Sequence, residues 1–76
     1  MGRIVESKLE PGTFDVFNRY SHKLGHIERY VSTLDLIYMP SVGLGKQFVR
    51  PDLLGIAIRL EMRHGEHFSA PRGVRL

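Results

Sequence analysis

Four histidines, arranged in two pairs, have the residue type and spacing best suited to chemistry in this chain. His22 and His26 are one helical turn apart, a spacing that can bind zinc or nickel. His64 and His67 would flank a tight hairpin turn in "HGEH", with Gly65 supplying the unusual backbone angle. Each pair alone is a weak ligand set, and a four-histidine site would require a polar helix face to meet the hairpin tip. We therefore expect solvated histidines, no metal and no cofactor.

Catalytic and nucleotide-binding arrangements have even less support. Acid–base chemistry by His64 with Glu66 lacks a nucleophile and a cleft, since a chain of 76 residues rarely encloses a cavity of about 300 Å³. The stretch "GLGK" does not fit a phosphate-binding loop. Pro40 stands where the first glycine belongs, and Gln47 stands where a hydroxyl would hold Mg²⁺. The sequence therefore predicts a protein that is not an enzyme.

Length and composition further restrict the class of protein. A chain of 76 residues forms one small domain, which buries about 60 % of its unfolded surface and gains stability from partners or oligomerisation. The chain has no cysteine, so it has neither disulfides nor a thiolate zinc site. No charged-then-apolar leader opens the sequence, and no apolar run approaches the ~18 residues of a membrane span. We expect a cytoplasmic protein without membrane contact.

The positive charge is concentrated in the second half of the chain. The formal net charge is +3, and residues 1–12 and 13–38 are each balanced. The excess after position 38 comes from six basic residues, Lys46, Arg50, Arg59, Arg63, Arg72 and Arg75. Only Asp52, Glu61 and Glu66 oppose them there, so we expect an anionic partner to meet this half. The six basic residues are the predicted partner-binding residues.

The segment "YSHKLGHIERYVSTL", residues 20–34, supports two interpretations. Its serine, glycine, valine and leucine spacing resembles the middle of a helix-turn-helix, which would indicate DNA binding. Alternatively, the apolar residues from Phe17 to Leu34 are spaced 3, 4, 3, 4 and 3 positions apart, as in one continuous helical seam. That seam consists of Phe17, Tyr20, Leu24, Ile27, Val31 and Leu34.

Two observations favour the continuous helix over the helix-turn-helix. Gly25 falls on the polar side of the wheel, and Ile27 keeps phase with the apolar residues before it. The candidate recognition segment also has no net positive charge, although phosphate contacts dominate DNA affinity. We predict one amphipathic helix over residues 13–36, capped by Thr13. Its seam would cover a small sheet or pair with a second copy of the chain.

The remaining segments indicate short strands and loops. "RIVESKL", residues 3–9, predicts a strand ended by Pro11 and Gly12. "LDLIYMP" predicts a helix end or short strand, and "PSVGLGK" predicts a loop with two glycines that allow positive φ. Phe48 between Lys46 and Arg50 could stack on a nucleic-acid base, but an ordinary strand with flanking charges explains it better.

The segment "PDLLGIAIRLEMRHG", residues 51–65, fits either a strand or a helix. Its even-numbered residues from 54 to 62 are apolar without a miss, which favours a strand. Pro51 and Asp52 suit a helical first turn, and Gly65 suits a C-cap. We prefer the strand. Arg59 and Arg63 point the same way in both cases.

These elements predict an α+β fold in which one long amphipathic helix packs on a small antiparallel sheet. The alternative is an all-α helical hairpin that dimerises. We expect residues 1–68 to form the domain and residues 69–76 to form a basic, flexible C-terminal tail.

The predicted function is a non-catalytic protein-binding or assembly module, a small subunit or inhibitor that docks on a larger protein or nucleoprotein complex. The grounds are the lack of catalytic motifs, the small size and a strand edge free for pairing. A homo-oligomer is compatible with this prediction. The alternative is a small basic regulator that binds DNA or RNA, through the helix-turn-helix-like segment or through Lys46 to Arg50 with the tail.

Overall fold

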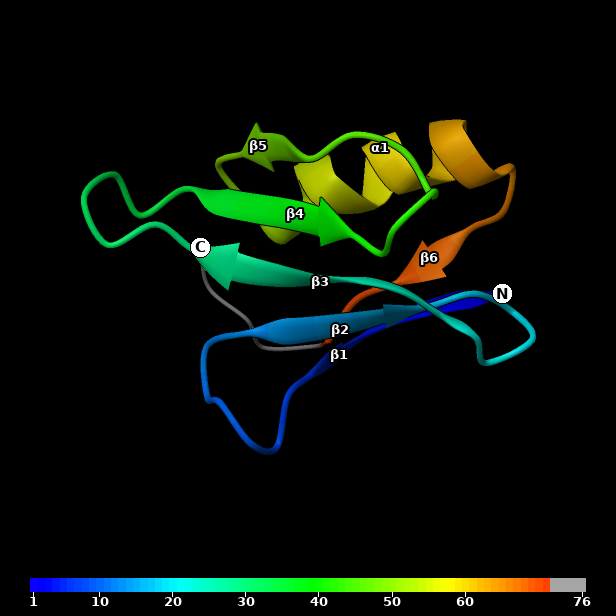
Figure 1. Ribbon diagram of the computed structural model, residues 1–76, viewed down its shortest axis with the longest axis horizontal. Coiled ribbons are helices and arrows are strands. Elements are labelled where there is room, and N and C mark those ends of the chain that lie inside the picture. The colour runs from blue at the N-terminus through cyan, green and yellow to red at the C-terminus, as the bar shows by residue number, and fades with distance from the viewer. Residues whose placement is uncertain (72–76) are drawn as a thin grey trace.

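The chain folds into a curled six-stranded sheet with one helix, as Figure 1 shows for the computed structural model, which describes residues 1–71. The strands are β1 (Gly2–Glu6), β2 (Phe14–Phe17), β3 (Lys23–Arg29), β4 (Leu36–Pro40), β5 (Phe48–Arg50) and β6 (Phe68–Ser69), and the helix is α1 (Leu53–His64). The strand order is β5-β4-β3-β2-β1-β6. All neighbours are antiparallel except β1 and β6, which are parallel. The α+β class is therefore confirmed, and the all-α alternative is wrong.

Short connections fold the first four strands into a meander. The turn predicted at Pro11 and Gly12 is confirmed, and Gly12 has a φ of 89°, which favours glycine. Between β2 and β3 the Asn18 side chain accepts hydrogen bonds from the backbone N–H groups of Tyr20 and His22, at 2.9 and 3.0 Å. Such an Asx turn fixes the reversal of the chain. The strand predicted near residues 3–9 is confirmed as β1.

The predicted helix over residues 13–36 is wrong, because this segment forms β2, β3, the start of β4 and the connections between them. The helix-turn-helix alternative is wrong for the same reason. A bulge explains the misleading spacing. Val16 pairs with Gly25 but Phe17 pairs with Lys23, so Leu24 is an extra residue in β3. The bulge resets the alternation of side chains, so Leu24 and Ile27 are both buried in the core although they are three positions apart in sequence.

The predicted seam is consequently divided. Leu24 and Ile27 lie in the core, whereas Tyr20, Val31 and Leu34 lie exposed in the connections between strands. Phe17 is half-buried at the end of β2, with the Arg3 guanidinium 5.1 Å from its ring centroid. These six residues do not share a face, so they offer no continuous seam for a second copy of the chain.

Residues 53–64 form α1, and the strand preferred for this segment is wrong. The Asp52 carboxylate accepts a hydrogen bond from the Gly55 N–H at 2.7 Å, as an N-cap does. Gly65 ends the helix at a φ of 68°, and its N–H donates to the Glu61 carbonyl at 2.8 Å. Gly65 is thus a helix C-cap, and the hairpin turn predicted at "HGEH" is wrong.

The apolar alternation in this segment is produced by two helical series. Ile56 and Leu60 are four residues apart and face the core, together with Leu53 and Ala57. Leu54, Ile58 and Met62 are also four residues apart but are exposed to solvent. The two series are offset by two positions, so together they imitate the period of a strand.

The core lies between the inner face of the sheet and one side of α1. It contains Ile4, Phe14, Val16, Leu24, Ile27, Leu36, Tyr38, Leu53, Ile56, Ala57, Leu60 and Phe68. The polar side-chain group among these core residues is the Tyr38 hydroxyl, which donates a hydrogen bond to the Leu24 carbonyl at 3.1 Å. Helix α1 contacts β4 and both edge strands, β5 and β6 (Figure 1), so it closes the gap that the curled sheet leaves open. No helix in this described part of the chain is long and apolar enough to cross a membrane.

Gly25 offers a test of the sheet. A Cβ atom at this position would lie 2.5 Å from the Met39 carbonyl oxygen and 2.8 Å from the Pro40 Cα, both backbone atoms that cannot move aside cheaply. We expect Gly25→Ala to destabilise the fold by about 1–3 kcal/mol, because overpacking forces the backbone to shift. Urea unfolding followed by circular dichroism measures this change. In a helix the same substitution would stabilise by about 1 kcal/mol, so a stabilised variant would contradict the β3–β4 pairing.

Candidate functional site

The outward face of α1 has three large apolar side chains that the core does not use. Leu54, Ile58 and Met62 are 67 %, 51 % and 73 % exposed. Their spacing of four residues aligns them along the helix, so they form one continuous stripe, which we call the outer stripe. Single exposed apolar residues are normal on protein surfaces, but a contiguous apolar patch marks an interaction site.

Arginines lie along the flank of α1 that faces β5. The Arg63 guanidinium is 5.1 Å from the centroid of the Phe48 ring and 6.0 Å from that of Tyr38. The Arg50 guanidinium is 5.3 Å from the same Phe48 ring. Arg59 lies one turn before Arg63, and the two line a small surface pocket with Met62. We call Arg50, Arg59 and Arg63 the arginine flank.

The arginine flank is not neutralised within the part of the chain that the structure describes. The ion pairs there join Arg19 to Glu66, Lys23 to Asp15, His26 to Glu28 and His67 to Glu61. None of these ion pairs includes the arginine flank or Lys46. In addition, the Nη1 atom of Arg63 is buried and has no hydrogen-bond partner among residues 1–71, although it remains a charged donor. The flank therefore favours an anionic partner.

The structure brings together three of the six predicted partner-binding residues, Arg50, Arg59 and Arg63. Lys46 follows Gly45, whose backbone lies against the Arg63 guanidinium, so it belongs to the neighbouring loop. Arg72 and Arg75 lie outside the described residues. The predicted strand around Phe48 is confirmed as β5. The Phe48 ring already contacts two guanidinium groups and the Tyr38 ring, 5.3 Å away, so it is no open stacking platform.

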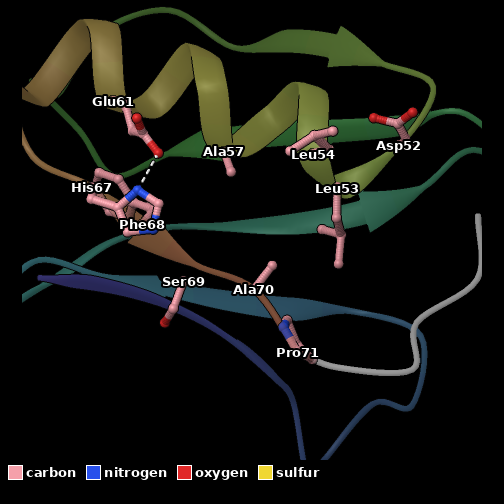
Figure 2. A pocket seen from close by; sticks show the side chains of 10 residues that line it. All are labelled: Asp52, Leu53, Leu54, Ala57, Glu61, His67, Phe68, Ser69, Ala70 and Pro71. Atoms are coloured by element: carbon pink, nitrogen blue, oxygen red, sulfur yellow. Dashed lines mark ion pairs between the residues drawn. The ribbon is translucent and has the colours of Figure 1, made fainter.

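The opposite flank of α1 borders a groove that the sequence analysis missed. Figure 2 shows Leu54, Ala57 and Glu61 on the helix and Phe68, Ser69 and Ala70 on the strand side of this groove, whose volume is about 460 Å³. At one end the Glu61 carboxylate lies 2.8 Å from Nδ1 of His67. The strand predicted for residues 51–64 could not indicate this groove. A strand does not bring the leucines, Ala57 and Glu61 to one side, whereas the helix does.

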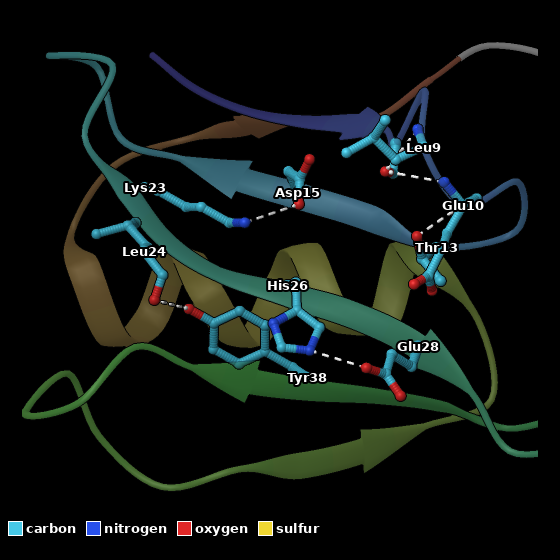
Figure 3. Close-up of polar contacts among 10 residues, drawn as sticks. Leu9, Glu10, Thr13, Asp15, Lys23, Leu24, His26, Glu28 and Tyr38 are labelled. Atoms are coloured by element: carbon cyan, nitrogen blue, oxygen red, sulfur yellow. Dashed lines mark hydrogen bonds and ion pairs between the residues drawn. The ribbon is translucent and has the colours of Figure 1, made fainter.

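A polar pocket of about 240 Å³ lies on the outer face of the sheet, beside β2 and β3. His26 Nε2 lies 2.9 Å from Glu28, and Lys23 Nζ lies 3.1 Å from Asp15; Figure 3 draws both ion pairs. The Thr13 hydroxyl, also in this pocket, donates to the Glu10 carbonyl at 2.7 Å instead of pairing with the imidazole. This pocket therefore presents an oriented histidine but no aligned nucleophile.

The two histidine pairs do not converge. His22 lies in the turn before β3 and His26 lies within that strand, whereas His64 ends α1 and His67 precedes β6. Within residues 1–71 no group of three or more His, Cys, Asp or Glu side chains could hold a metal ion. Comparison of the chain with models of protein families, with curated proteins and with solved structures found no match. Any functional proposal therefore depends on the outer stripe, the arginine flank and the groove beside α1.

His64 is the histidine whose environment is most altered by folding. Its ring lies edge-on to Phe68 with centroids 6.0 Å apart, and its Nε2 atom is buried without a partner in the described structure. Burial lowers the pKa of His64 below its ordinary value of 6.5, the Arg63 charge lowers it further and Glu66 opposes the shift. The folded protein thus favours the neutral imidazole.

This environment predicts a pH-dependent stability. Below the ordinary pKa of 6.5 the unfolded chain binds a proton at His64 more readily than the folded chain, so the free energy of unfolding falls as pH decreases. Above that value the imidazole is neutral in both states and the effect disappears. We expect His64→Gln to show a shallower loss of stability between about pH 7 and about pH 5 than the wild type, measured by urea titrations. Equal slopes would show that His64 does not contribute.

Proposed function

We propose that this protein is a non-catalytic protein-binding module that docks on a larger assembly through the outer stripe and the arginine flank of α1. The observation that supports this most directly is the adjacency of an exposed apolar stripe and arginines without carboxylate partners in the described structure. The absence of cysteine fits a reducing compartment such as the cytoplasm, where we propose that the protein acts.

The chemistry of this face specifies the partner. Leu54, Ile58 and Met62 repeat every fourth residue, which suits the apolar face of another helix laid along α1. Arg59 and Arg63 lie beside the stripe and would meet carboxylates on the same partner helix. Arginine pairs with carboxylates in a two-pronged geometry that adds direction to the apolar contact. The partner is therefore an acidic amphipathic helix of a larger protein.

Burial of the outer stripe would supply most of the affinity. Each large apolar side chain that is removed from water contributes about 1.5–3 kcal/mol. The arginine flank adds selectivity more than affinity, because exposed ion pairs contribute at most about 1 kcal/mol each. Nucleic acid binding would use the arginines but would leave the apolar stripe without a role. For this reason a protein partner accounts for more of the surface.

Photo-crosslinking tests this proposal directly. A photoreactive phenylalanine is placed at Met62 in one variant and at Leu9 in a control, since Leu9 is 93 % exposed and lies in the loop between β1 and β2. We expect Met62, but not Leu9, to crosslink to one protein in native-host extract. Mass spectrometry should place the crosslink in a segment of the partner protein that has helical apolar periodicity and an excess of carboxylates. Crosslinks to nucleic acid or lipid, or equal crosslinking yields from the Met62 variant and the control variant, would refute the proposal.

Charge reversal separates the role of the arginine flank from net charge. We expect Arg59→Glu to weaken binding of the crosslinked partner about tenfold, because a favourable contact becomes a repulsive one. Lys8→Glu is the matched control, since it changes the net charge equally at an exposed site in the β1–β2 loop. Isothermal titration calorimetry at two salt concentrations measures both variants. Equal weakening by Arg59→Glu and Lys8→Glu would contradict a specific contact.

A further inference from the structure

Within residues 1–71, strand β6 has one backbone edge with no strand paired to it. The Gly2 N–H donates to the His67 carbonyl at 2.8 Å, and β6 pairs with β1 through Phe68 and Ser69. Backbone groups alternate in direction along a strand, so His67 and Ser69 direct theirs toward β1. Phe68 therefore directs its N–H and C=O away from β1, toward the groove beside α1. Such an edge is a template for an additional strand.

The groove beside this edge has the shape for an extended chain. Its volume of about 460 Å³ lies between α1 and the segment from His67 to Pro71. In Figure 2 Leu54 and Ala57 on the helix and Ala70 and Pro71 on the opposite side give it apolar walls. An added strand directs alternate side chains to one face, and apolar walls accept those side chains.

The charges of the groove are opposite to those of the arginine flank. Asp52 and Glu61 line it, and no lysine or arginine does so among residues 1–71. The Asp52 carboxylate is engaged by the Gly55 N–H, and the ion pair of the Glu61 carboxylate within residues 1–71 is with the exposed His67 ring, at 2.8 Å. Glu61 is 37 % exposed in its side chain, so an incoming cation can reach it. This arrangement favours a basic side chain at the His67 end.

We propose that the groove between α1 and β6 binds an extended segment of a protein, which adds a strand to β6 and places a lysine or arginine against Glu61. The edge of Phe68 supplies backbone hydrogen bonds, the apolar walls accept the alternate side chains and Glu61 selects the charge. This site lies on the opposite flank of α1 from the arginine flank. It shares Leu54 with the outer stripe but no residue with the arginine flank.

Peptide probes of known composition test the site without knowledge of the natural ligand. The first probe is an acetylated and amidated pentapeptide of alternating valine and arginine. The second has glutamate in place of arginine, and the third is the arginine peptide with N-methylated backbone amides. Binding is followed on the full chain by amide chemical shifts. We expect the arginine peptide to shift the amides of Phe68, Ala70 and Leu54 with a dissociation constant of about 1 mM or below.

Each probe isolates one component of the proposal. N-methylation removes the backbone donors and leaves the side chains, so we expect it to weaken binding at least about tenfold. Glu61→Lys should weaken the arginine peptide and strengthen the glutamate peptide. Glu10→Lys is the matched control, with the same change in net charge at an exposed position outside the groove, and should leave both affinities unchanged.

Three results would overturn the proposal. No shifts at the groove up to about 5 mM arginine peptide would show that the edge accepts no strand. Equal affinity of the N-methylated peptide would show that side chains bind without strand addition. Equal effects of Glu61→Lys and Glu10→Lys would show that Glu61 does not select the charge. Retention of the native circular dichroism spectrum by both variants excludes unfolding as the cause.

Discussion

The burial of the sheet's inner face against one side of α1 is the constraint on which the rest of the structure depends. The sheet curls but does not close, because its edge strands β5 and β6 pair with only one neighbour each. Ile56 and Leu60 fill the space between these edges and are fully buried. An open, apolar sheet face without this helix would remain in water together with two unpaired edges. A single helix thus completes the core and covers the gap in the sheet.

The same position makes α1 chemically asymmetric. Its inner side is fixed by the core, so its remaining sides are free to differ. The flank toward β5 has Arg59 and Arg63, the flank toward β6 has Glu61, and the outer stripe separates them. A module with cationic and anionic sides can hold two segments of opposite charge at once, on one rigid element. This organisation supports the proposed role as a small subunit within a larger assembly.

Local chemistry in the sequence predicted the α+β class and some short elements, whereas the main helix was placed in the wrong segment. Pro11 and Gly12 gave the first turn, and Asp52 and Gly65 have the types expected of helix caps. The extra residue in β3 could not be foreseen, because Leu24 and Ile27 have helical spacing in sequence and only the ladder shows the bulge. The apolar alternation after Pro51 was misleading because an exposed stripe and a core stripe are superimposed there. Arg59 and Arg63 were expected to share a face, but the groove at Glu61 required the helix to be known.

The parallel pairing of β1 with β6 joins segments that are almost the whole described chain apart. Gly2 lies opposite Phe68, and any side chain at Gly2 would collide with the Phe68 ring. Contacts between distant segments form late, because the loop between them must first be closed at a cost in chain entropy. During synthesis on the ribosome β1 emerges before β6, so the two strands cannot pair until β6 has been made. The nascent chain therefore displays the unpaired edge of β1 until the final strand arrives, which is the interval in which a chaperone or a partner has access to that edge.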